Sequence, residues 1–229
     1  MKRFWKDVAT VAVDGGHDIH LDGRPVRTPG RAPLTLPSPA LAQAVAEEWR
    51  AVDKDVDPRA MPLTGLANAA IDRIAADPAT FAAGLAQYGE SDLLCYRADH
   101  PLELQLRQQA SWDPLLDWAK TRYGAPLVTA TGIMHRAQPP ASLTALSEAV
   151  AARSPFELAA LSPLVTVSGS LIAALALLER AATPDDIWSA INLDEDWQVE
   201  HWGEDDLARQ ARATRHADFD AGVRLLELL

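Results

Sequence analysis

The chain has a single cysteine, Cys95, among its 229 residues. A disulfide within the chain is therefore impossible, and a structural zinc site built from several cysteines is excluded. One cysteine suits a reducing compartment. Because Cys95 lies in the apolar run Asp92-Leu-Leu-Cys-Tyr-Arg97, we expect a small buried side chain rather than a catalytic thiol.

Positive charge is scarce. The chain has 21 lysines and arginines against 32 aspartates and glutamates, which gives a net charge of −11. Phosphate contacts depend on lysine and arginine, so we expect no nucleic-acid partner, and an acidic surface suits anionic membranes equally poorly. Such a surface fits solubility or a basic partner.

No segment is a convincing signal peptide or membrane span. Charges recur too early at the N-terminus for the apolar core of a signal peptide. Residues 158–178 carry no charge over 21 positions, which nominally reaches membrane-spanning length. Because Pro163, Thr166 and the run Ser168-Gly-Ser170 interrupt the stretch, we expect a helix buried on all sides in a soluble core instead of membrane insertion.

The common catalytic motifs are missing. The sequence contains no Walker-type loop, no Gly-x-Gly-x-x-Gly and no Gly-x-Ser-x-Gly. Gly15-Gly16 lies in an expected hairpin turn, and Ser168-Gly-Ser170 is interpreted as easing close packing of the buried helix. The histidines are dispersed along the chain. We therefore expect no cofactor, no bound metal and no small-molecule substrate.

Residues 1–36 predict an antiparallel meander of short strands. Val8–Val13 is a β-branched run, and Ile19 and Leu21 alternate with polar neighbours after a Gly15-Gly16 turn. Ser38-Pro39 then suits the start of a helix. Apolar residues at helical spacing follow, at Leu41, Val45, Trp49 and Val52.

The remainder is mainly helical, so the predicted fold class is α+β. The polar connector Asp53–Pro58 is the predicted boundary between a β-rich N-terminal domain with one helix, residues 1–57, and a mainly helical domain, residues 58–229. Short strands near 92–97 and 126–131 are candidates to return to the N-terminal sheet. Helices are expected over 101–123, 140–152, 155–180, 184–202 and from about 204 to the end.

The most unusual stretch is the acidic-aromatic segment, Leu193–Gly203. Extended to Asp206, it contains seven acids, no lysine or arginine, and the tryptophans Trp197 and Trp202. In one continuous helix, the apolar face would hold Ile187, Trp188, Ile191, Val199 and Trp202, with Glu195 in its middle and Asp194 at its edge.

A carboxylate on an apolar face is costly unless it is paired or used. Three explanations stay open. The segment is a solvated helical face, or Glu195 pairs with an arginine such as Arg209 or Arg212, or the acids and tryptophans form a recognition surface. A fourth possibility is a small metal-dependent enzyme using Asp194, Glu195, Glu200 and His201, although no second motif supplies a nucleophile or an oxyanion hole.

Nearly the whole chain resembles the assembly chaperones that act on the alpha subunit of F-type ATP synthase. Each matching segment is weak alone, but their order and spacing are specific. The segments are Ile19–Pro29, Glu47–Trp49, Met61–Asn68 with Asp72, Asp92–Arg97, Trp112–Ala119 with Tyr123-Gly124, Thr131–Met134 and Asp194–Gly203.

The resemblance implies a binding protein that is not an enzyme. Such chaperones hold the free alpha subunit, cover apolar interface that would otherwise aggregate, and give way to the beta subunit without ATP. The family fold is a small β-rich domain followed by a helical domain. Eukaryotic members carry a mitochondrial targeting extension, whereas this sequence starts directly at the domain, so we expect a bacterial, cytoplasmic protein.

The resemblance also implies site residues. An acid at the start of the acidic-aromatic segment, matching Asp194 or Glu195, is implicated in family function. Trp49 matches an important tryptophan, which we interpret as a structural core residue because it lies on the apolar face of its helix. The predicted partner-binding set is Asp194, Glu195, Trp197, Glu200 and Trp202.

Overall fold

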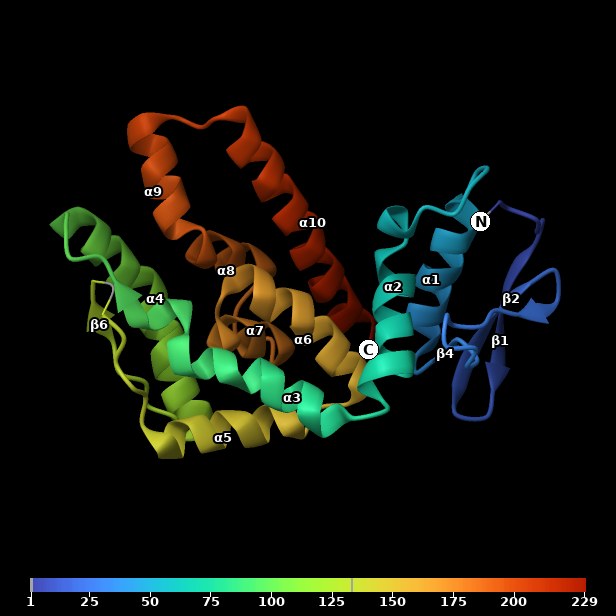
Figure 1. The fold of residues 1–229 in the computed structure, drawn as a ribbon, viewed down its shortest axis with the longest axis horizontal. Helices are drawn as coiled ribbons and strands as arrows, with labels where there is room; N and C mark the ends of the chain where they lie inside the picture. Colours follow the sequence, from blue (N-terminus) through green and yellow to red (C-terminus); the bar gives the residue numbers. More distant parts are fainter. Residues whose placement is uncertain (1, 133) are drawn as a thin grey trace. The chain divides into compact units, whose positions relative to one another are not determined.

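The computed structural model describes residues 2–132 and 134–229 (Figure 1). A small antiparallel sheet near the N-terminus precedes a mostly helical chain, so the predicted α+β class is confirmed. Contacts divide the chain into two compact units. Unit 1 holds the described residues up to Pro78 with Ser154–Ala160 and Ala221–Leu229, and unit 2 holds Ala79–Arg153 and Leu161–Asp220. The predicted boundary between residues 57 and 58 stays a prediction.

The sheet of unit 1 is built around β2. Strands β1 (Val8–Val13) and β2 (Gly16–Leu21) form an antiparallel hairpin, and β3 (Arg24–Pro25) and β4 (Thr35–Leu36) both pair with β2. Gly15 closes the hairpin with φ of 85°, a left-handed conformation that glycine adopts without strain. The predicted meander is confirmed.

Helix α1 (Pro39–Ala51) covers this sheet and positions the next helix. The Ser38 hydroxyl caps α1 by accepting a hydrogen bond from the Leu41 amide at 3.0 Å. On the same helix, the Glu48 carboxylate accepts hydrogen bonds from the Leu63 and Thr64 amides, both at 2.8 Å, at the start of α2 (Pro62–Ala69). A carboxylate at this helix N-terminus satisfies two amides that have no partner within the helix.

Asp72 holds the loop after β3 in unit 1. It lies in the short π-helix η2 (Ala70–Ile74). Its carboxylate accepts hydrogen bonds from the Thr28 hydroxyl at 2.6 Å and the Gly30 amide at 2.7 Å. A Cβ atom at Gly30 would lie 2.6 Å from the Asp72 Oδ1 atom, so a larger side chain would displace this contact.

Helix α7 (Leu171–Leu178) is the buried centre of unit 2, and α4 (Leu102–Tyr123) packs against it. The uncharged stretch was predicted to form one helix, but it forms two. Helix α6 (Pro155–Ser168) ends before Gly169, whose φ is 64°. Ser170 then caps α7, so this run breaks the helix rather than easing helix packing. No helix among the described residues has the length and apolar character that crossing a membrane requires.

Asp92 caps α7 from inside unit 2. It is fully buried and accepts hydrogen bonds from the Ile172 amide at 3.0 Å and the Leu94 amide at 3.1 Å. Burial raises the pKa of Asp92 to about 6, although the hydrogen bonds to Ile172, Ser170 and Leu94 oppose this rise. Asp92 thus joins the start of the run Asp92–Arg97 to the helix break.

The short strands β5 (Tyr96–Arg97) and β6 (Ala130–Thr131) pair with each other in a parallel two-stranded sheet. The expectation that they return to the N-terminal sheet is therefore wrong. Residues 93–95 form the 3-10 turn η4 (Leu93–Cys95), which leaves only two residues for the strand. Cys95 is buried as predicted, and burial, followed by the nearby Asp92 charge, raises the pKa of its thiol to about 12.

The remaining helices complete the two units. The predicted helix over 184–202 is interrupted at Asn192, and the predicted C-terminal helix is confirmed. Within the resembling segment Thr131–Met134, Ile133 lies outside the described residues. The remaining elements are η1 (Pro58–Ala60), α3 (Pro78–Ala86), η3 (Gln87–Ser91), α5 (Pro140–Ala151), α8 (Pro184–Ile191), α9 (Leu193–Trp202) and α10 (Asp206–Leu228).

Candidate functional site

The acidic-aromatic segment forms its own helix, α9, in unit 2. Asn192 separates it from α8, and the Asn192 side-chain amide donates a hydrogen bond to the Trp188 carbonyl at 2.8 Å. This break resets the helical phase, so the predicted shared apolar face is wrong. Trp197 is 6% exposed, whereas Trp202, predicted on the apolar face, is 77% exposed.

Glu195 forms an ion pair with an arginine of α10. Its carboxylate binds Arg215, neither of the two arginines suggested by the sequence, and the neighbouring Asp196 binds Arg212. Glu195 therefore does not lie in the middle of an apolar face, as the single-helix geometry predicted. Of the predicted alternatives for Glu195, pairing with an arginine inside the fold is the one that the geometry matches.

Asp194 has a neutral partner instead. The buried Gln108 of α4 donates a hydrogen bond from Nε2 to Asp194 Oδ1 at 2.7 Å, while Gln108 Oε1 accepts one from the Ala98 amide at 2.9 Å. The Gln108 amide group is thus held at both ends. Asp194 Oδ2 has no hydrogen-bond partner within residues 2–132 and 134–229.

Trp197 anchors α9 to α4. The Arg107 guanidinium lies 4.7 Å from the centroid of the Trp197 ring, and it forms ion pairs with Glu200 at 2.7 Å and Glu103 at 3.2 Å. The hydrogen bond to Glu200, ahead of the other contacts, raises the pKa of Arg107. His201 stacks on Trp197 with centroids 4.1 Å apart, and its Nδ1 lies 2.8 Å from the Trp197 carbonyl oxygen.

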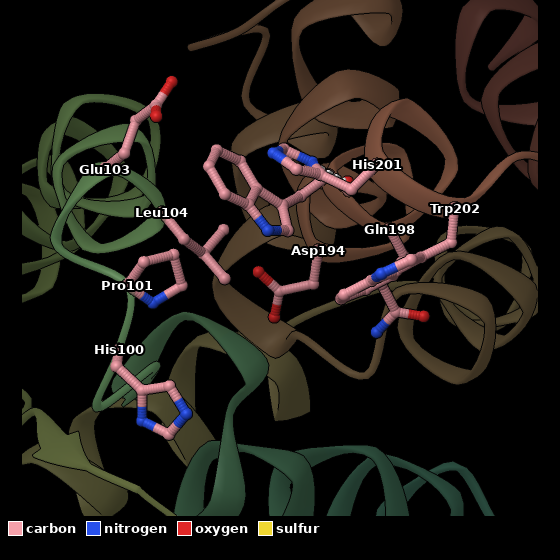
Figure 2. Close-up of a pocket in the computed structure, with 9 residues that line it drawn as sticks. His100, Pro101, Glu103, Leu104, Asp194, Gln198, His201 and Trp202 are labelled. Carbon is pink, nitrogen blue, oxygen red and sulfur yellow. Dashed lines mark hydrogen bonds between the residues drawn. The ribbon is translucent and has the colours of Figure 1, made fainter.

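A pocket of about 570 Å³ opens between the start of α4 and α9, and we call it the α4–α9 pocket (Figure 2). Figure 2 shows the Asp194 carboxylate within it, between the Pro101 ring and the Trp202 indole, whereas the Glu103 carboxylate points away. No lysine or arginine is among the described lining residues. These are His100, Pro101, Glu103, Leu104, Asp194, Trp197, Gln198, His201 and Trp202.

Two exposed apolar side chains on α4 lie outside the pocket. Leu102 and Leu106 are 67% and 55% exposed and lie one helical turn apart, on the opposite face of α4 from the pocket residue Leu104. The pocket itself combines apolar lining residues with the Asp194 carboxylate, and such a surface fits docking of a protein segment.

The structure does not assemble the cluster required for the alternative metal-dependent enzyme. Asp194, Glu195 and Glu200 have different partners, namely Gln108, Arg215 and Arg107. Across the described parts of the chain, no group of three or more histidine, cysteine, aspartate or glutamate side chains is placed to hold a metal ion.

Trp49 lies in unit 1, away from the acidic-aromatic segment along the chain. It is 7% exposed and contacts Trp5 edge to face, with ring centroids 5.2 Å apart. The Trp5 Nε1 atom donates a hydrogen bond to the Trp49 carbonyl oxygen at 3.3 Å. These contacts place the Trp49 indole in the core of unit 1.

Sequence reasoning missed the α4 half of the site. Leu104, Gln108 and Trp112 are spaced four residues apart and are all buried. A glutamine within such an apolar stripe indicates a satisfied buried amide and therefore a specific partner. That pattern could have identified Gln108, but nothing in the sequence identified Asp194 as its partner.

A sequence model of the family described as ATP12 chaperone protein matches residues 2–120, about half of the chain. The chain belongs to the ATP12 chaperone family. This family acts in the assembly of ATP synthase. The resemblance inferred from the sequence segments is confirmed at the level of the family.

Solved structures and a curated member of the ATP12 family agree with this assignment. The chain is 44% identical to Atp12 from Paracoccus denitrificans, with a TM-score of 0.94 and coverage of 99% of this chain and 97% of that chain. An aspartate-to-lysine mutant of the same protein gives a TM-score of 0.95, with the same identity and coverage. The mitochondrial protein atp12 of Schizosaccharomyces pombe is 25% identical over 214 residues, which cover 88% of this chain and 74% of that protein.

Proposed function

We propose that this protein binds the unassembled alpha subunit of ATP synthase and shields its apolar interface until the beta subunit replaces it. The observation that supports this most is the α4–α9 pocket, where the exposed Trp202 indole lies beside apolar lining residues in a member of an assembly chaperone family. An isolated subunit of an oligomer exposes interface that aggregates unless another protein covers it.

The proposed binding surface includes four of the five residues predicted from the sequence. Trp202 and Asp194 face the pocket, Trp197 supports its wall, and Glu200 holds Arg107 against Trp197. Glu195 has a different role in this proposal, because its ion pair with Arg215 holds α9 against α10 within unit 2.

Binding of this kind requires no catalysis and no cofactor, so we propose a chaperone that is not an enzyme. We also propose that it acts in the bacterial cytoplasm. The bacterial origin of a 44% identical relative supports the bacterial setting, and the single, buried cysteine suits a reducing compartment.

A co-purification experiment tests the proposal. Purified alpha and beta subunits from the same organism are mixed separately with the tagged protein, and the light scattering of each subunit is followed on warming. Capture of alpha but not beta, with suppressed scattering of alpha, is expected. Failure to capture alpha, or equal capture of both subunits, contradicts the proposal.

A further inference from the structure

The acids of α9 divide into three that have a cation partner and one that has none. Glu195, Asp196 and Glu200 form ion pairs with Arg215, Arg212 and Arg107, respectively. Asp194 receives only the neutral amide of Gln108. The one carboxylate without a cation is therefore the one that lies inside the α4–α9 pocket (Figure 2).

A partly buried carboxylate beside apolar side chains is stabilised by a cationic side chain of a bound partner. Apolar groups next to that cation keep water out of the pair. Here the walls come from Leu104, Pro101 and the Trp197 and Trp202 rings, and no lysine or arginine lines the described pocket. The negative charge of Asp194 therefore favours binding of a cation, and none of the described lining residues is a lysine or arginine.

We propose that the α4–α9 pocket is a socket for an arginine side chain carried on an apolar segment of the partner protein. The guanidinium pairs with Asp194 Oδ2, and its flat face stacks on the exposed Trp202 indole. Apolar neighbours of that arginine pack against Pro101 and Leu104 on the α4 side of the pocket. The pocket volume of about 570 Å³ lies in the range that accepts a ligand of this size.

Arginine fits this site better than lysine for two reasons. Its weakly hydrated guanidinium loses less on leaving water than an ammonium group does, and its planar group stacks on an indole. The His201 ring is held away from Asp194, because its Nδ1 lies 2.8 Å from the Trp197 carbonyl oxygen and the ring stacks on the Trp197 indole. The other nearby histidine, His100, is 84% exposed and lies 2.7 Å from Asp99.

The proposal rests on the proposed function for the identity of the partner, but its chemistry is tested without that partner. Three blocked peptides with the sequence Leu-Ala-X-Ala-Leu, where X is arginine, lysine or citrulline, are titrated into the whole protein. Binding is followed by the indole N–H resonance of Trp202, assigned with Trp202→Phe. Citrulline matches arginine in shape but has no charge.

The arginine peptide is expected to bind at least ten-fold more tightly than the citrulline peptide, with lysine between them. Asp194→Asn keeps the acceptor for Gln108 and should abolish the preference, while the matched control Glu195→Gln should retain it. Equal affinities, a preference that survives Asp194→Asn, or no shift with the arginine peptide at millimolar concentration overturns the proposal.

Failure of this inference is distinguishable from failure of the proposed function. Capture of the alpha subunit without any arginine preference overturns the arginine socket alone. An arginine preference without capture of alpha overturns the proposed partner and leaves the socket in place.

Discussion

The Gln108 side-chain amide donates a hydrogen bond to the Asp194 carboxylate at 2.7 Å, which joins α4 to α9 at the base of the α4–α9 pocket. The neighbouring acid, Glu195, points instead to Arg215 of α10. Adjacent acids on one helix therefore have separate roles. One presents charge to the pocket, and the other holds the helix in place.

Glu195→Gln should lower stability without a selective loss of partner binding. The Glu195 and Arg215 side chains are 29% and 41% exposed, so their ion pair contributes about 1 kcal/mol rather than the larger value of a fully buried pair. Urea unfolding of Glu195→Gln, of Arg215→Gln and of the double variant measures the coupling between the two side chains. Additive effects of the two single changes would show that the ion pair contributes nothing.

Asp194→Asn should leave stability nearly unchanged and weaken capture of the alpha subunit. The asparagine Oδ1 still accepts from Gln108, and only the charge inside the pocket is removed. We expect binding to weaken at least ten-fold, equivalent to about 1.4 kcal/mol. Calorimetric titration with the alpha subunit at low and high salt checks this, because the loss should shrink as salt screens the charge.

Trp202→Ala should reduce binding without unfolding the protein. Its indole is 77% exposed, so little core packing is lost, whereas an exposed tryptophan at a docking site typically contributes about 2 kcal/mol, or roughly 30-fold in affinity. Val13→Ala, at an exposed apolar side chain of the unit 1 sheet, is the matched control. An equal loss of affinity in both variants would indicate non-specific hydrophobic binding instead of a defined site.

Trp49→Ala should destabilise unit 1 by about 3–5 kcal/mol, because it leaves a large cavity beside Trp5. Trp49→Phe retains most of the packing and should cost less. Thermal and urea unfolding give both values. If Trp49→Ala unfolds at the wild-type midpoint and yet fails to capture the alpha subunit, Trp49 acts at the interface rather than in the core.

Asp92 should make stability fall as pH rises from about 4 to about 6. Its folded pKa of about 6 lies above the ordinary value of 3.8, so in this window the folded state holds a proton that the unfolded state has released. The free energy of unfolding should therefore fall by about 3 kcal/mol across this window. Asp92→Asn cannot ionise, so the difference in urea midpoint between wild type and this variant should change across the window. A constant difference between them would contradict the raised pKa.

Sequence patterns correctly predicted the turns and helix starts that are stabilised by residues close together in the sequence. The hairpin at Gly15 and the capped start of α1 at Ser38 follow from turn and capping chemistry, and both are confirmed. The same rules treated Ser168-Gly-Ser170 as part of a helix. The helix break there is stabilised by Asp92, which lies far away in sequence and which helical periodicity does not take into account.

The site was only partly predictable for the same reason. Composition identified the acidic-aromatic segment, and the prediction that Asp194 or Glu195 matters narrowed the choice to two residues. Which acid faces the pocket depends on the break at Asn192 and on Gln108 and Arg215, contributed by α4 and α10. These contacts depend on tertiary packing. The sequence analysis assumed one continuous helix through residue 192, and it therefore assigned Glu195 and Trp202 to the wrong face.

The α4–α9 pocket is tested by light scattering of the warmed alpha subunit in the presence of wild-type protein, of Asp194→Asn combined with Trp202→Ala, or of Glu195→Gln. If the α4–α9 pocket shields the alpha subunit, wild type and Glu195→Gln suppress aggregation at equimolar concentration and the double variant does not. Full protection by a folded double variant would contradict the assignment of this pocket as the binding site.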